Sequence, residues 1–186
     1  MSIELIISIV LGFSLAAAAG FRVFIPLLVL SLSAHFGWFP VNESWEWVGS
    51  TAALWLLGVA AAVEIFAYFI PYVDNLLDSI AVPLAGIAGS LLMLATMGDV
   101  NPAFAWALAI IAGGGAAAAI SGTTSATRLT STATTGGFAN PIVSTAETGA
   151  ATAVSVASIF SPFIALILVL LFIGGVWRVI KKIRGT

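Results

Sequence analysis

Long apolar stretches separated by short polar segments occupy most of this 186-residue chain. A helix needs about 20 mostly apolar residues to cross the roughly 30 Å hydrocarbon core of a bilayer. Residues 3–39 and 50–97 each hold nearly two such lengths. Breaks are expected near Gly20 and Pro71, and a turn at 98–102 precedes one further length. The pattern predicts helices over residues 3–19, 21–37, each side of Pro71 within 50–97, and about 103–121.

The segment from residue 121 to residue 148 departs from this pattern, because nearly half of it is Ser or Thr. A disordered linker would be richer in charge and proline. Non-helical backbone inside a membrane persists only where it is buried in protein or lines water. A polar loop and a broken or re-entrant element are therefore both kept as alternatives, and a last helix is predicted over about 150–177. The expected fold is an all-α, polytopic transmembrane bundle of about six helices.

Two polar segments suit the membrane surfaces. Residues 38–47 combine two glutamates with three tryptophans, a composition typical of the headgroup region. The C-terminus carries the main basic run, which the positive-inside rule assigns to the cytoplasm. This run consists of Arg178, Lys181, Lys182 and Arg184.

The composition leaves little surface for water. Hydrophobic residues make up 61% of the chain and charged residues 8%, against roughly 25% charged in soluble domains. We therefore expect a single transmembrane domain over residues 1–186. The absence of cysteine excludes disulfides and thiolate metal sites, and a net charge of −2 argues against a nucleic-acid partner.

A weak internal similarity suggests that the chain contains a duplicated unit, with halves 1–100 and 101–186. Residues 71–79 (PYVDNLLDS) and 141–149 (PIVSTAETG) both start with proline and have valine two residues later. Each also carries an acid six or seven residues after the proline. Duplicated units with interrupted helices at matching positions are common in transporters.

Six ionisable residues fall within the apolar part of the chain. Each costs roughly 2.5 to 3.5 kcal/mol at the centre of a membrane helix, so each needs a partner and usually has a purpose. The two arginines and four acids sum to −2, an excess that protonation, an added cation or contact with water must balance. The six are Arg22, Glu64, Asp74, Asp78, Arg128 and Glu147.

The acids among them allow two interpretations. Asp74 and Asp78 are four residues apart and share one helix face, and Glu64 lies two turns before Pro71 on the same side. Such a carboxylate cluster can hold a metal cation or a proton. The same residues also suit a turn between antiparallel helices, where Asp74 and Asp78 would only touch headgroup water.

The arginines either neutralise those acids or bind an anionic group such as a phosphate. Arg22 lies near a predicted helix start, where snorkelling to the interface is the alternative. Arg128 is surrounded by Ser, Thr and Gly, whose hydroxyls and amides suit an ion or headgroup site. The candidate substrate- or ion-binding residues are Arg22, Glu64, Asp74, Asp78, Arg128, Asn140 and Glu147, with metal ligands left unassigned.

The sequence carries none of the common catalytic motifs, such as G-x-x-x-x-G-K, G-x-S-x-G or H-E-x-x-H. We therefore expect no enzyme activity and no cofactor. The glycine triplet at 113–115 lies in an alanine-rich stretch and is expected to allow close helix packing.

The chain contains five further short motifs: GFRVFIPLL (20–28), EIFAYFIPYVD (64–74), PLAG (83–86), TSATRLTST (124–132) and NPIVSTAE (140–147). Together they resemble an uncharacterised bacterial membrane family, the domain of unknown function 4126. Tyr68 and Phe69 stand where that family often has an Asp-Lys pair. The resemblance implies a polytopic protein of a bacterial inner membrane and supplies no established activity.

These features lead to one functional expectation and two alternatives. We expect a small transporter or channel-like carrier for a small solute or ion, with the charged residues and the Ser/Thr-rich segment lining its path. The first alternative is a protein that moves or modifies a lipid headgroup, held by the arginines. The second is a scaffold or assembly subunit whose charges pair with a partner. Assembly into a homo-oligomer is also left open.

Overall fold

A computed structural model describes residues 3–98 and 100–184, and the described residues form helices without any strand. Asp99, in the predicted turn at 98–102, lies outside the described residues. The elements are α1 (Ile3–Ala19), α2 (Phe24–His35), the 3₁₀ helix η1 (Glu43–Gly49), α3 (Thr51–Ala67), α4 (Pro71–Thr96), α5 (Pro102–Leu108), the π-helix η2 (Ala109–Gly114), α6 (Gly115–Thr135), α7 (Asn140–Phe160) and α8 (Pro162–Arg184).

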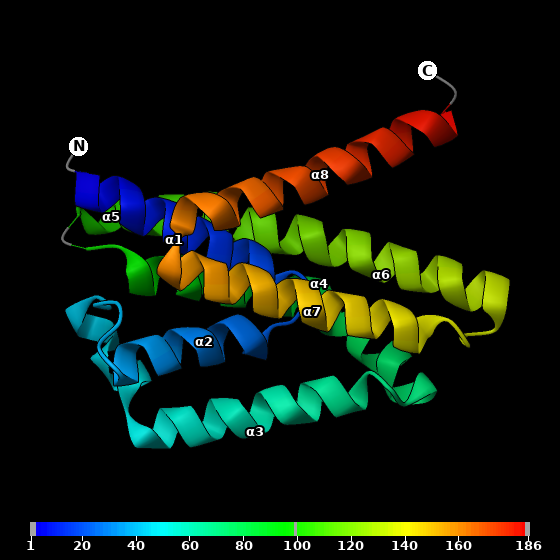
Figure 1. Cartoon of the computed structure of the whole chain (residues 1–186), viewed down its shortest axis with the longest axis horizontal. Helices are drawn as coiled ribbons and strands as arrows, with labels where there is room; N and C mark the ends of the chain where they lie inside the picture. Colours follow the sequence, from blue (N-terminus) through cyan, green and yellow to red (C-terminus); the bar gives the residue numbers. More distant parts are fainter. Residues whose placement is uncertain (1–2, 99, 185–186) are drawn as a thin grey trace.

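The first two helices form a hairpin inside the bundle. Figure 1 shows α1 running from the N-terminal end to the middle of the molecule, where the chain turns and α2 returns to the same end. At 1.5 Å per residue their 17 and 12 residues are about 26 and 18 Å long, too short to cross about 30 Å. Their predicted boundaries are close to the observed ones, but two full membrane spans were expected here.

Gly20 lies where this hairpin turns and where it approaches α6 most closely. A Cβ atom on Gly20 would lie 2.6 Å from the carbonyl oxygen of Ala117 and 2.6 Å from Cβ of Ile120. Only glycine therefore allows the turn to sit this deep against α6.

Fewer helices than predicted are long enough to span a bilayer. Three described segments have the length and apolarity for a span, and a fourth does if η1 and α3, which meet at 65°, count as one. The prediction of about six is thus reduced to three or four, although several long apolar helices are typical of a membrane protein. The three spans are Leu76–Thr96, Pro102–Thr135 and Asn140–Phe160.

The Ser/Thr-rich segment is helical over most of its length, so it is not a simple polar loop, and it is broken once, between α6 and α7. It forms most of α6, a turn in which Gly136 and Gly137 have φ of 65° and 88°, and the start of α7. Hydroxyls along α6 donate to carbonyls one turn earlier, for example Thr127 to Thr123 at 2.9 Å and Thr134 to Thr130 at 2.8 Å. These threonine hydroxyls therefore need no water, and a helix rich in threonine can lie in apolar surroundings.

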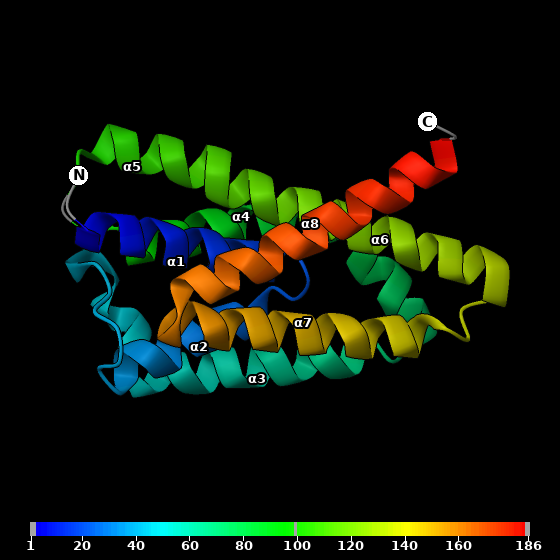
Figure 2. The same ribbon diagram turned by 45° about the horizontal axis from the view of Figure 1, so that its top comes forward.

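The last predicted helix, over about 150–177, is two helices. α7 begins earlier, at Asn140, and ends at Phe160, and α8 begins at Pro162. Proline disfavours helical backbone at the residue before it, and Ser161 has φ −154° and ψ 77°. Figure 2 shows α8 crossing the bundle at an angle to α7.

The core is built around α1, which packs against α4, α6, α7 and α8. Leu11 and Leu15 of α1 and Leu92 and Met93 of α4 are fully buried. Gly113 and Gly114 of η2 allow close packing against α4, since a Cβ on Gly113 would lie 2.7 Å from the carbonyl oxygen of Gly89. The expected role of the glycine triplet is thus confirmed for its first two members.

We predict that Gly113→Ala lowers the free energy of unfolding by about 1 to 3 kcal/mol, because the added methyl group overpacks the α4 interface. Gly115→Ala is the matched control, since a Cβ there meets nothing within 4 Å. The control should be neutral or stabilise by up to about 1 kcal/mol through helix propensity. Melting temperatures of both variants in detergent check this, and equal values would contradict the packing.

Candidate functional site

Arg22 lies at the tip of the α1–α2 hairpin and is 1% exposed. Its Nη1 lies 3.1 Å from Oε2 of Glu147. Its Nη2 donates to Oγ and to the carbonyl oxygen of Ser144 at 2.7 and 3.1 Å, and its Nε donates to Oγ1 of Thr148 at 3.2 Å. Glu147 and Thr148 follow Ser144 by three and four residues on α7, so both lie near Ser144 on one side of the helix. One side of α7 therefore contacts all three nitrogens of the guanidinium group, and Nη1 also donates to the carbonyl oxygen of Phe21 at 3.3 Å.

Arg128, on α6, is 3% exposed and has carboxylates on two sides. Its Nη2 and Nε both pair with Glu147, the Nε at 3.2 Å from Oε1. Its Nη1 pairs with Oδ1 of Asp74 and lies 3.7 Å from Oδ1 of Asp78. Asp74 and Asp78 are one turn apart on α4, so Arg128 joins α4, α6 and α7.

Asn140, the first residue of α7, extends this network. Its Nδ2 donates to Oδ2 of Asp74 at 2.9 Å and to Oγ1 of Thr132 at 3.0 Å. Its Oδ1 is buried and has no hydrogen-bond partner among the described residues. Asn140 thus fixes the second oxygen of Asp74 and keeps one unused acceptor inside the cluster.

The ring of Tyr68 lies between the two arginines. Cζ of Arg22 lies 4.0 Å and Cζ of Arg128 3.9 Å from the ring centroid. Tyr68 comes directly after α3 and is 8% exposed, so its ring fills the space between two like charges. Attraction to the ring face stabilises both cations by an amount typical of cation–π contacts, about 0.5 to 2 kcal/mol each.

Glu64 has a different role from the other acids. Its Oε1 and Oε2 accept hydrogen bonds from the backbone amides of Val23 and Phe24 at 2.8 and 2.9 Å. These amides begin α2, so the carboxylate caps the helix and faces the positive end of its dipole. It forms no salt bridge with any residue that the structure describes.

The structure brings all seven candidate residues into one connected region. The interfacial alternative for Arg22 and the headgroup-water alternative for Asp74 are wrong, because Arg22 is 1% and Asp74 also 1% exposed. Asp78 lies at the rim, with a side chain 11% exposed. Among the described residues, no three His, Asp or Glu side chains are arranged to hold a metal ion. The binding roles of the seven stay a prediction.

Three further residues contribute to this region and were missed from the sequence. We call these three and the seven candidates together the charge cluster. Tyr68 is one helical turn after Glu64, and Ser144 and Thr148 are within one turn of Glu147 on α7. Helical spacing from the predicted acids could have found all three. Apolar and hydroxyl side chains carry no charge signal, however, and were not singled out.

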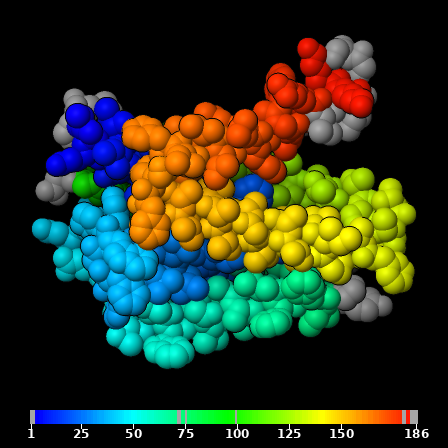
Figure 3. Space-filling model, viewed as in Figure 1, coloured from blue at the N-terminus to red at the C-terminus, as the bar shows by residue number. Residues whose placement is uncertain are grey.

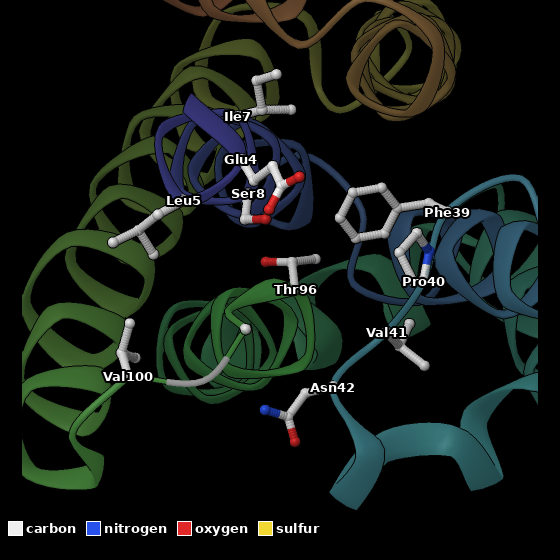
Figure 4. A pocket seen from close by; sticks show the side chains of 11 residues that line it. Glu4, Leu5, Ile7, Ser8, Phe39, Pro40, Val41, Asn42, Thr96 and Val100 are labelled. Atoms are coloured by element: carbon white, nitrogen blue, oxygen red, sulfur yellow. The ribbon is translucent and has the colours of Figure 1, made fainter. Parts of the chain in front are cut away.

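A hollow of about 710 Å³ lies at the opposite end of the molecule, beside the N-terminal end of α1 and the C-terminal end of α4. Figure 4 shows the side chains of Glu4, Ser8 and Thr96 around it, facing the loop that carries Asn42. Asp74 and Thr96 are 22 residues apart on α4, or about 33 Å. The hollow and the charge cluster thus lie about one bilayer core apart.

Comparison with known proteins gives one match. The family described as "Domain of unknown function (DUF4126)" matches residues 9–182, nearly the whole chain. No curated protein and no solved structure shows a significant match.

We predict that Asp74→Asn and Arg128→Gln each lower the free energy of unfolding by about 3 to 5 kcal/mol, because each leaves a buried charge without its partner. The double variant should lose less than the sum of the two, with a coupling of about 1 to 3 kcal/mol. Denaturation in detergent measures all three. Arg178→Gln, at an exposed arginine, serves as the control, and additive losses at positions 74 and 128 would contradict the pairing.

Proposed function

Because the chain belongs to this family of unknown function, its activity has to be argued from its own geometry, and we propose that it carries a small ion across a bilayer. The observation that supports this most is that one buried carboxylate, Glu147, is shared by two arginines from different elements. A shared partner can be exchanged, and exchange of ion pairs between two arrangements is what a carrier needs.

The charge balance of the cluster favours a cation, with the proton included. The cluster contains four carboxylates and two guanidinium groups, so its formal charge is −2. Glu147, Asp74 and Asp78 contact the arginines. The amides at the start of α2 offset part of the charge on Glu64. The remaining deficit of positive charge is what a passing cation or a bound proton would supply.

Asp78 is the best candidate for the exchangeable carboxylate. Its only salt bridge among the described residues is the 3.7 Å contact with Arg128, whereas Asp74 has both Arg128 and Asn140. It also lies at the rim of the cluster, where an ion from solution arrives first. Binding there would weaken the hold of Asp78 on Arg128.

A route between the two ends of the molecule would need a conformational change. The hollow at the N-terminal end stops at Thr96, and fully buried Leu11, Leu15 and Leu92 lie between it and the cluster. The tip of the α1–α2 hairpin is the part suited to move, because it is attached to α7 by exchangeable polar contacts of Arg22 and not by apolar packing alone. Carriers with interrupted helices at mid-membrane work by such alternation.

The location and orientation follow as part of the same proposal. In this proposal the long apolar helices cross a cell inner membrane in several passes, with the C-terminus in the cytoplasm. The exposed Arg178, Lys181 and Lys182 at the end of α8 support this orientation through the positive-inside rule. The charge cluster then lies towards the cytoplasmic side and the hollow towards the outer side.

The alternative of a lipid headgroup held by the arginines has less support. The guanidinium nitrogens of Arg22 and Arg128 already have carboxylate, hydroxyl or carbonyl partners. Neither guanidinium group therefore has a free pair of N–H donors with which to bind a phosphate. The scaffold alternative predicts that the cluster completes its pairing through another chain. A buried cluster with both arginines already paired does not require one.

We predict that purified protein in liposomes catalyses proton or K⁺ movement under an imposed membrane potential, measured with an internal pH dye and a K⁺ electrode. Asp78→Asn should lower the rate at least roughly tenfold, equivalent to about 1.4 kcal/mol in the barrier, because the exchangeable carboxylate is lost. Glu43→Gln, an exposed acid in η1, is the control and should keep the rate of the unaltered chain.

Folding of each variant is checked by circular dichroism and by elution as a single species in detergent. Flux that is equal in Asp78→Asn and in the unaltered chain would remove Asp78 from the proposal. Absence of proton and K⁺ flux from the unaltered, folded chain would overturn cation transport itself.

A further inference from the structure

The second half of α8 stands away from the bundle and leaves a groove over α6. α8 packs against α1 and α7, and Figure 3 shows its C-terminal part projecting from the body. The groove between α6 and α8 has a volume of about 860 Å³. Its lining includes Gly122, Thr123, Thr127 and Thr130 of α6 and Gly175 and Val176 of α8.

The lining suits a hydrocarbon chain and offers little to a polar ligand. The hydroxyls of Thr123, Thr127 and Thr130 each donate to a carbonyl of the preceding turn, at 2.9 Å in all three cases. Their methyl groups and the neighbouring small residues form the surface that remains. Along α6 the groove extends from Ala119 to Thr130, a helical rise of about 16 Å. One leaflet of a 30 Å hydrocarbon core is about 15 Å thick.

The groove ends beside the basic run of α8. Arg178 comes three residues after Gly175, and Lys181 and Lys182 follow within the next turn or so. All three are exposed and form no salt bridge with a described residue, and the side chain of Arg184 lies outside the described residues. An apolar slot one leaflet deep thus opens next to unpaired cations.

We propose that this groove binds one acyl chain of an anionic phospholipid, whose headgroup phosphate pairs with Arg178, Lys181 and Lys182. The combination of an apolar slot of leaflet length and unpaired cations at its mouth selects this occupant. A second copy of the chain is the competing occupant, and it would bring two basic runs together without a compensating acid on α6. The site is separate from the charge cluster and does not depend on the proposed transport.

The test uses the full chain in detergent and counts bound lipids by native mass spectrometry. Phosphatidylglycerol and phosphatidylcholine with identical acyl chains are titrated in parallel. We expect one tightly bound phosphatidylglycerol per chain, with an apparent affinity at least roughly tenfold above that of phosphatidylcholine, because each cation near the headgroup adds attraction. Equal binding of the two lipids would overturn the role of the basic run.

Two sets of variants separate the slot from its charges. Gly122→Leu with Gly175→Leu fills the groove, and a Cβ at either position meets nothing within 4 Å, so folding should be kept. This pair should lower phosphatidylglycerol binding at least tenfold, while Gly149→Leu, an equally open glycine on α7, should leave it unchanged. Replacing Arg178, Lys181 and Lys182 by Gln should abolish the preference for the anionic lipid.

Three outcomes would overturn the proposal. Unchanged lipid binding after the groove is filled would show that the lipid sits elsewhere. Retained preference in the Gln variant would show that the basic run is not involved. A dimer that carries no groove lipid, and that dissociates when the groove is filled, would assign the groove to a second copy of the chain.

Discussion

The sharing of Glu147 by two buried arginines is the constraint around which the other elements are arranged. A charge removed from water without a partner costs several kcal/mol, so neither Arg22 nor Arg128 could be buried unless a carboxylate came with it. Glu147 on α7 pairs with both arginines, and this requires the hairpin tip, α6 and α7 to keep fixed positions relative to one another. Tyr68 then separates the two cations that Glu147 has brought together.

The same constraint explains why the chain can turn inside the bundle. A turn between α1 and α2 exposes amides that water would otherwise satisfy, and backbone of this kind is tolerated at depth only inside protein. Glu64 accepts the amides of Val23 and Phe24, and Gly20 lets the turn touch α6 directly. The hairpin thus depends on an acid from α3 and on a glycine as much as on its own apolar residues.

The grouping of the acids and arginines could be predicted because each one is expensive in an apolar setting and needs a partner. Their partners could not, since Glu147 meets Arg22 across 125 residues of sequence and only tertiary packing decides that contact. Helix positions up to residue 121 followed from apolar length and from Gly20 and Pro71. Length alone, however, cannot distinguish two spans from a hairpin. The helix rich in threonine was missed because composition counts a hydroxyl as polar even where the preceding turn satisfies it.

The cluster is unequal in a way that bears on how it can move. Both arginines are paired, but among the described residues Asp78 has one ion-pair contact, at 3.7 Å, and Oδ1 of Asn140 has no hydrogen-bond partner. A cation entering at the rim would therefore compete with Arg128 for carboxylates without first breaking the contact between Arg22 and Glu147. Loosening would begin on the α4 side and reach the hairpin only through Glu147. In this order, Glu147 is the residue through which cation binding at Asp78 would affect the position of α1 and α2.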